Sequence, residues 1–436
     1  MHRTHLLPLG AATVASLILA LPATAQEGGP DGRLLTFGLS TGITATDNAD
    51  LDTEDPVEEV EATTSLSLGL LTATPTQRFE LGTGAGLRAL VTGEDDEDTF
   101  ALDDPNGRFL YSRQSRAAEL TLQGRFDSQE LSSLTPLELT SDDLQDLEDL
   151  QDLEDLLDAN EVSGDARRLT FDLDATLETR RDSPFGITYS LGLSGERYSD
   201  APESFEDETK ASAGLGLRFD LDEVTRATTD IRYVTSDDPE EDDRLSLDLD
   251  LTRTIGTDQI GASFGVVEEG DSTRLSLSAN AARDFSAGRI SGSLGVSRPD
   301  GGDLALIGSL GLARELSPTQ EVSLNLSRSV VRLDGSDPGE PERERAVSSL
   351  TADYSHAVTR LWRFGLDAQL TQTEVIDGPD DSETFGRIGA DLSRPLTENW
   401  SLSMGVSHRF EENADGSDAT SNTVSVSLNR NFRIPY

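Results

Sequence analysis

The 436-residue chain has no cysteine, a single lysine and few aromatic residues, which make up 5% of the total. The lack of cysteine excludes disulfides, thiolate nucleophiles, iron–sulfur clusters and cysteine-type zinc sites. Basic residues are also scarce: 35 Lys and Arg stand against 82 Asp and Glu, which gives a formal net charge of −47. Because phosphate binding needs clustered basic side chains, this balance excludes nucleic acid as a partner.

Long hydrophobic runs are missing after the N-terminus, which excludes membrane-spanning helices. Residues 1–25 are different: Arg3 precedes an apolar stretch over residues 14–21, and Ala23 to Ala25 are small. This arrangement is typical of a signal peptide, and we expect cleavage between Ala25 and Gln26. No cysteine follows that point, so a lipoprotein anchor is excluded, and residues 26–436 are predicted to form a single domain.

What fills the rest of the chain is alternation of apolar and polar residues at period two. In residues 245–252, for example, four leucines alternate with Ser246, Asp248, Asp250 and Thr252. Successive side chains of a strand point to opposite faces, so each such segment has one apolar and one polar face. About twenty segments fit, most of about 9 to 13 residues, close to the ~9–11 residues of a membrane-crossing strand. The order of the residues therefore argues against the disorder that low hydrophobic content alone would suggest.

The connections between these segments alternate in kind. Nine are short, for example near residues 74–77 and 395–399, and ten are longer and hold most of the acids, the longest over residues 127–164. This alternation predicts an all-β, transmembrane, antiparallel up-and-down β-barrel of about 20 strands (18 to 22), with long acidic extracellular loops and short periplasmic turns. Arginines recur where strands enter short turns, either as solvated turn charges or as anchors for lipid phosphate. These arginines are Arg253, Arg283, Arg314, Arg360 and Arg394.

On these patterns the chain resembles a Gram-negative outer-membrane β-barrel protein, broadly porin-like. Its amphipathic last segment, with Val424, Val426 and Leu428 and a final Tyr436, is similar to the terminal strand by which barrel-insertion machinery recognises that family. The resemblance implies an outer-membrane location, contact with lipid and lipopolysaccharide, and transport. Strands begin within about ten residues of the expected cleavage site, which leaves no room for a plug domain ahead of the barrel.

The polar strand face is the most informative set of residues, because in a barrel it becomes the lumen. About 20 strands exceed what side chains can fill, since 16 to 18 already leave an aqueous channel. Charged lumen walls set ion preference. The predicted pore-lining residues are Arg88, Arg168, Asp172, Asp174, Arg218, Asp230, Arg232, Asp248, Asp250 and Asp391.

Three functions of a membrane barrel are compatible with these features, and an extracellular soluble all-β protein is a fourth possibility. The first is a passive, water-filled channel for cations or small neutral solutes. The second is an export or assembly barrel, for example for surface polysaccharide, and the third is a surface scaffold that binds divalent cations or a partner through its acidic loops.

Metal binding and catalysis have little support. The acidic loop repeats Asp between leucines, and its clustered carboxylates suit Ca²⁺, but the ligand order of an EF-hand is absent. The weak candidates are Asp143, Asp146, Asp149, Asp152 and Asp155. The stretch Gly261 to Gly265 has the letter pattern of a nucleophile elbow, but it lies inside an alternating segment. His356 and His408 are predicted to face away from Ser263, so we expect no catalytic residue and no cofactor.

Three glycines at alternating positions, Gly82, Gly84 and Gly86, lack the following helix that a phosphate loop requires. We expect them to leave room in the lumen or to ease strand curvature.

Overall fold

The computed structural model describes most of residues 32–435. The described ranges are 32–49, 51, 56–92, 100–130, 166–199, 207–238, 242–270, 272–299, 302, 304–333, 343–376, 382–412 and 416–435. The expected signal peptide, the five weak Ca²⁺ candidates and Tyr436 lie outside these ranges.

The described residues form twenty strands and the connections between them. The strands are β1 Gly32–Thr46, β2 Glu59–Thr74, β3 Gln77–Thr92, β4 Phe100–Gln114, β5 Ala118–Glu130, β6 Arg167–Thr179, β7 Phe185–Ser199, β8 Glu208–Asp220, β9 Thr225–Ser236, β10 Arg244–Ile255, β11 Asp258–Glu269, β12 Ser272–Phe285, β13 Gly288–Pro299, β14 Ala305–Ser317, β15 Gln320–Leu333, β16 Arg343–Ala357, β17 Arg363–Val375, β18 Ser382–Pro395, β19 Trp400–Glu412 and β20 Asp418–Pro435. In this part of the chain no helix is long and apolar enough to cross a membrane.

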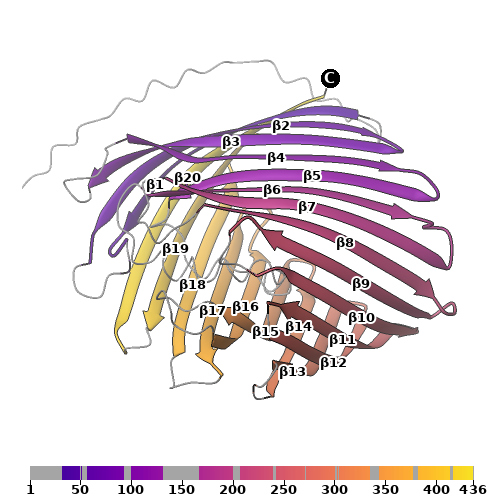
Figure 1. The fold of residues 1–436 in the computed structure, drawn as a ribbon. Coiled ribbons are helices and arrows are strands. Elements are labelled where there is room, and N and C mark those ends of the chain that lie inside the picture. Colours follow the sequence, from indigo (N-terminus) through magenta and orange to yellow (C-terminus); the bar gives the residue numbers. More distant parts are fainter. Residues whose placement is uncertain are drawn as a thin grey trace, which may run out of the picture.

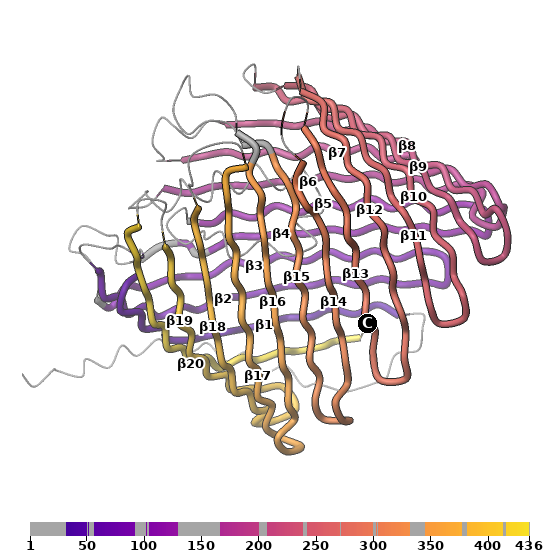
Figure 2. The backbone as a smooth tube through the Cα atoms, turned by 90° about the horizontal axis from the view of Figure 1, so that it is seen from below, coloured from indigo at the N-terminus to yellow at the C-terminus, as the bar shows by residue number. Residues whose placement is uncertain are grey.

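Each strand pairs antiparallel with the next, and β1 also pairs with β20, so the sheet closes on itself (Figures 1 and 2). Leu34 lies opposite Pro435 and Thr46 opposite Thr423 across this seam. Closure satisfies the backbone groups that an edge strand would expose, which a lipid environment demands. The predicted all-β, up-and-down barrel is confirmed, with 20 strands.

The two rims differ as predicted. Nine short connections lie at one rim, from Pro75 and Thr76 between β2 and β3 to residues 396–399 between β18 and β19. β1 starts and β20 ends at this same rim, because Leu34 pairs with Pro435. The other ten connections lie at the opposite rim; nine have at least five residues, whereas β11 and β12 are joined by only two residues, 270–271, where a longer loop was expected.

Half of the strands are longer than the sequence pattern indicated. They run from 12 residues in β9 to 18 residues in β20; ten of them fit the expected length of 9 to 13 residues and the other ten exceed it. A membrane crossing needs only ~9–11 tilted residues. Backbone pairing continues past the apolar band into polar sequence, since a hydrogen-bonded ladder does not require apolar side chains. The extra residues extend the wall beyond the membrane.

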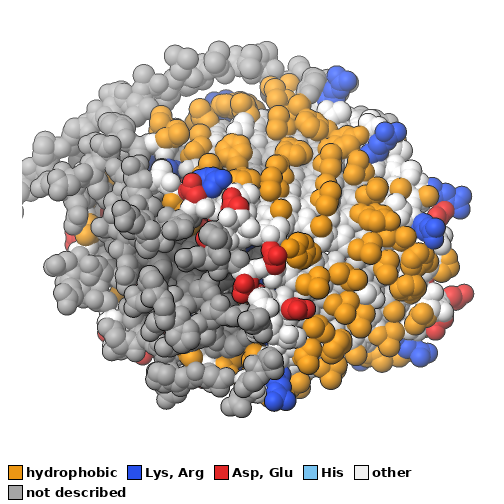
Figure 3. Space-filling view, viewed as in Figure 1, with side chains coloured by type: hydrophobic (Ala, Val, Ile, Leu, Met, Phe, Trp, Pro, Cys, Tyr) orange, Lys and Arg blue, Asp and Glu red, His pale blue; other side chains and the backbone are white. Residues whose placement is uncertain are grey.

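The outward face carries large apolar side chains at every second position. Leu191, Leu277 and Leu294 are 62%, 57% and 64% exposed. Apolar side chains cover the barrel surface over β3 to β10 in Figure 3. Apolar patches of this extent are not tolerated in water, and they match the lipid-facing band of a transmembrane barrel.

Candidate functional site

The inward face of the wall is the candidate site, and it has two chemically different halves. The half from β3 to β10 carries charged side chains at mid-height, whereas β11 to β15 carry mainly serine, glycine and asparagine. The strand register brings the inward positions of neighbouring strands side by side. Polar groups from strands far apart in the sequence therefore meet in continuous rows around the lumen.

Ion pairs and hydrogen bonds between neighbouring strands fix many of the charges. Arg125 Nε lies 2.6 Å from Oδ2 of Asp172, and Gln123 donates a hydrogen bond of 3.2 Å to Asp174. Arg168 pairs with Glu196, and its side chain is only 7% exposed. These pairs neutralise both partners, so this part of the wall is charged but locally balanced.

Three aspartates on adjacent strands form a different arrangement. Asp230 of β9 lies directly opposite Asp248 of β10 in the strand register, and Asp250 follows two positions along the same face. Arg232 borders them on β9 and donates a hydrogen bond of 3.3 Å to Ser212. Within the described residues no group of three or more acidic or histidine side chains has the geometry of a metal site. The three carboxylates therefore form an acidic strip on the wall, referred to below as the aspartate strip.

Glycines make the space that the lumenal carboxylates occupy. Gly216 is paired with Asp230, and a Cβ at that glycine would lie 2.7 Å from Oδ1 of the aspartate. Gly265 stands in the same relation to Asp248, at 2.9 Å. Asp391 likewise lies over its cross-strand partner Gly365. The carboxylates therefore lie flat along the wall instead of standing out into the lumen.

The predicted glycine ladder serves the same purpose. A Cβ at Gly82 would lie 3.3 Å from the side chain of Arg108, and one at Gly84 would lie 3.1 Å from Asn106. The prediction that these glycines leave room in the lumen is confirmed at both positions.

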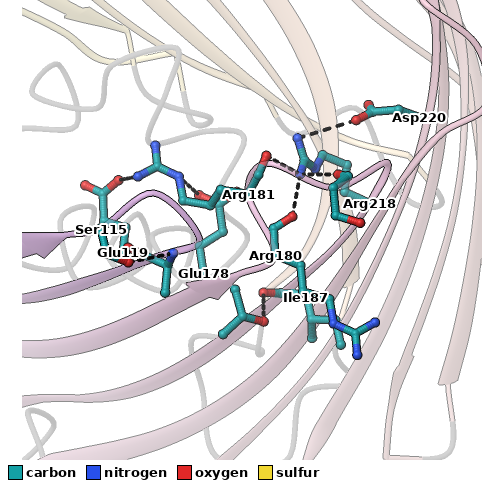
Figure 4. A network of polar contacts seen from close by, with 11 residues as sticks. Ser115, Glu119, Glu178, Arg180, Arg181, Ile187, Arg218 and Asp220 are labelled. Atoms are coloured by element: carbon teal, nitrogen blue, oxygen red, sulfur yellow. Dashed lines mark hydrogen bonds and ion pairs between the residues drawn. The ribbon is translucent and has the colours of Figure 1, made fainter.

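Arg218 supports the wall at the short-turn rim (Figure 4). Its Nη2 donates hydrogen bonds to the backbone carbonyls of Arg180, Arg181 and Ser183, at 3.4, 3.1 and 3.2 Å. Its Nη1 lies 3.6 Å from Asp220. This guanidinium therefore holds the β6–β7 turn against β8.

A row of hydroxyl groups lies on the inward face from β14 to β17. Ser309, Ser327, Ser349 and Thr371 are consecutive cross-strand partners from β14 to β17. Ser327 and Ser349 share a hydrogen bond of 2.6 Å, and further serine pairs join β11 to β12 and β13 to β14. This row can exchange hydrogen bonds with water and solutes without charge, although Asp353 and Asp367 face each other on β16 and β17, closer to the short-turn rim.

The charged half borders a cavity of about 780 Å³ along β1 to β9. Its lining includes inward-facing residues of both signs, among them Glu80, Arg108 and Lys210. A space of this size is within the ~300–1,000 Å³ typical of small-molecule sites.

All ten residues predicted to line a pore occupy inward-facing register positions, including Arg88 near the long-loop end of β3. The structure brings together the aspartate strip and separates it from Asp391 on β18. Sequence reasoning missed Arg108, Arg125, Glu196 and Lys210, although their place in the period-two alternation could have identified them.

Ser263 and His408 lie on the opposite faces of the wall that the sequence pattern predicted, so they do not form a pair of a nucleophile and its base. Ser263 is in the middle of β11 and bonds to Ser278, not to a histidine. His408 is on the outward face of β19, where its Nδ1 contacts Asn422 Oδ1 at 2.9 Å.

Comparisons with known proteins give structural similarity alone. No protein-family model matches the chain, and no curated protein matches its sequence. A ferric enterobactin receptor (PfeA) mutant from Pseudomonas aeruginosa superposes with a TM-score of 0.52 at 10% identity, over 91% of this chain and 80% of that chain. The siderophore receptor PirA from Acinetobacter baumannii gives 0.51 at 8% identity, over 91% and 80%. OccAB3 from A. baumannii gives only 0.40 at 11% identity, over 92% and 99%. The closed 20-strand wall, its apolar outer face and the two receptor structures show that this chain has the fold of an outer-membrane β-barrel protein.

Proposed function

We propose that the barrel is a passive, water-filled channel for cations or small neutral solutes across the outer membrane. The observation that supports this most directly is the aspartate strip on the inward face of a closed 20-strand barrel. A barrel of this strand number encloses more space than its own side chains fill. Every strand that the structure describes belongs to the wall.

The charge preference follows from which lumenal charges are balanced. Arg125 and Asp172 neutralise each other, as do Arg168 and Glu196. Asp230 and Asp248 instead face each other as like charges. A low-dielectric wall focuses the field of such charges into the lumen, which concentrates cations and repels anions. Neutral solutes are served by the hydroxyl row, which offers hydrogen bonds without charge.

The test is ion selectivity in planar bilayers. Protein refolded in detergent should conduct, and its reversal potential in a KCl gradient should show preference for K⁺. The variant D230N/D248N/D250N should move that potential toward the non-selective value. The matched control R125Q/D172N removes one charge of each sign and should leave it unchanged. Strict anion selectivity, or no conductance from correctly folded protein, would refute the proposal.

The route to the membrane is a separate proposal. We propose cleavage after Ala25 and insertion of the barrel through its last strand, β20, which ends next to Tyr436 and pairs with both β19 and β1. Mass spectrometry of protein extracted from outer membranes should give the mass of a chain beginning at Gln26. We propose further that the acidic long loops contact lipopolysaccharide and its divalent cations, on the basis of the chain's charge of −47.

A further inference from the structure

Both tryptophans of the chain lie at the short-turn rim. Trp362 precedes β17 and Trp400 begins β19, and the side chains of both are half-buried. Register with Arg430 places Trp400 on the outward face, and Trp362 lies against Arg394, which occupies an outward position of β18. Tryptophan is enriched at membrane–water interfaces on such a face. The two tryptophans mark the level at which this rim meets lipid headgroups.

An arginine is stacked on each of these tryptophans. The guanidinium carbon of Arg394 lies 5.1 Å from the ring centre of Trp362. That of Arg430 lies 4.9 Å from the ring centre of Trp400 and 4.1 Å from that of Phe432. Such cation–π stacking holds a guanidinium in place and leaves its edge free to form hydrogen bonds.

Neither arginine is neutralised within the part of the chain that the structure describes. No ion pair joins Arg394 or Arg430 to a carboxylate there. The Nε atom of each is buried and has no hydrogen-bond partner. Other arginines of the described chain also lack an ion pair, but Arg394 and Arg430 combine this with stacking on a tryptophan and a buried Nε.

The two arginines face the same stretch of lipid. Arg430 lies opposite Trp400, and Arg394 lies opposite Leu402, two residues further along β19. Their strands are separated by one other strand, which places them ~10 Å apart across the wall. Directly toward the long-loop side, Leu402 and Leu428 form an outward apolar pair. If the arginines held the headgroup of a lipid, the acyl chains of that lipid would therefore lie on the apolar wall.

We propose that Arg394, Arg430, Trp362 and Trp400 form a binding site for the phosphate of an anionic phospholipid in the leaflet on the short-turn side. Arginine forms paired hydrogen bonds to phosphate oxygens, and neither guanidinium has a hydrogen bond or ion pair within the described residues. The location on the outward face, beside apolar wall, selects a lipid phosphate over one dissolved in water.

Tryptophan fluorescence can test the site, because the chain has no tryptophan elsewhere. Refolded protein is placed in phosphatidylcholine vesicles that contain phosphatidylglycerol, with bromine on the acyl chains of one lipid or the other. Quenching is normalised to unbrominated vesicles for each variant. Brominated phosphatidylglycerol should quench the tryptophan fluorescence as strongly as if its mole fraction next to the tryptophans were roughly fivefold higher than in the whole vesicle. This is the enrichment expected when one basic side chain attracts an anionic lipid.

The variant R394Q/R430Q should abolish this enrichment. The control R253Q/R314Q removes two exposed, outward arginines of the same rim that carry no tryptophan contact, and it should retain the enrichment. Heat-dependent gel mobility confirms that each variant is folded. Equal quenching by the two lipids in the unmodified protein, retained enrichment in R394Q/R430Q, or equal loss in the control would each overturn the proposal.

Discussion

Asn422 of β20 donates two hydrogen bonds to the carboxylate of Asp47, which directly follows β1. Its backbone N–H lies 2.6 Å from Oδ1 and its side-chain amide 2.8 Å from Oδ2. The two residues are 375 positions apart in the sequence and join the first strand to the last at the long-loop rim. Because Oδ1 of Asn422 also contacts His408, the side-chain amide is held in the orientation that donates to Asp47.

The substitution D47A is therefore expected to weaken closure of the barrel. Hydrogen bonds to an exposed carboxylate contribute about 1 kcal/mol after allowance for solvent. The urea concentration at the midpoint of unfolding in detergent should therefore fall. Gel mobility of heated and unheated samples distinguishes folded from unfolded protein and so measures this midpoint. D418A, which removes an exposed carboxylate at the start of β20, serves as the control.

The same contact predicts an acid-sensitive component of stability. The backbone N–H of Asn422, followed by its side-chain amide, lowers the pKa of Asp47 below its ordinary value of 3.8. A lowered folded-state pKa contributes stability that is fully present above pH 3.8 and is lost as the pH falls through the folded-state value. The stability difference between the unmodified protein and D47A should therefore shrink below pH 4. A difference that is constant between pH 7 and pH 3 would contradict this.

The Arg168–Glu196 pair is expected to be sensitive to loss of either partner. Their side chains are 7% and 16% exposed, so R168A leaves a carboxylate in a largely buried place, at a cost of about 3–5 kcal/mol. The double variant R168M/E196L should recover much of that loss, because it removes both charges. A double-mutant cycle on unfolding free energies measures the coupling, and simple additivity would contradict the prediction.

Arg218 is expected to control the order of the β6–β7 turn. R218A removes the donor to three backbone carbonyls, a loss of about 1–2 kcal/mol of local stability. Hydrogen exchange should accelerate in the turn over residues 180–184. R226A, which removes an arginine paired with Asp220 on the same rim, should leave that turn protected.

Two turn glycines should differ in their tolerance of alanine. Gly288 has φ +155° and a Cβ there would meet the backbone of Ala313, whereas Gly256 has φ +66° and open space around it. G256A should cost about 1 kcal/mol from the left-handed backbone alone. G288A should cost clearly more because the β13–β14 pairing must shift, and thermal unfolding would show the order.

Period two and turn spacing were enough to predict the strand number, the two rims and the inward face. These features depend on residues close in sequence: an alternation such as that of Leu245 to Thr252 fixes the faces of β10 without any knowledge of its neighbours. The ends of the strands could not be predicted, since pairing in β20 continues through polar residues such as Asn422.

Contacts across the wall could not be predicted either. Arg168 meets Glu196 because of the register between β6 and β7, and the stacking of Arg394 on Trp362 depends on how β17 and β18 align. A shift of one residue in either register would place these side chains on opposite faces. The same limit explains why Arg218 was predicted as a pore-lining charge, although its guanidinium binds a turn.

The uneven distribution of charge around the lumen wall has a consequence for the orientation of the solutes that pass through. Negative charge on β9 and β10, next to uncharged serine, glycine and asparagine from β11 to β15, gives the electric field a component across the barrel, perpendicular to the path of transport. A solute with a permanent dipole would be oriented so that its positive end points toward the aspartate strip. Two solutes of equal size and zero net charge would then cross at different rates, according to where their polar groups lie.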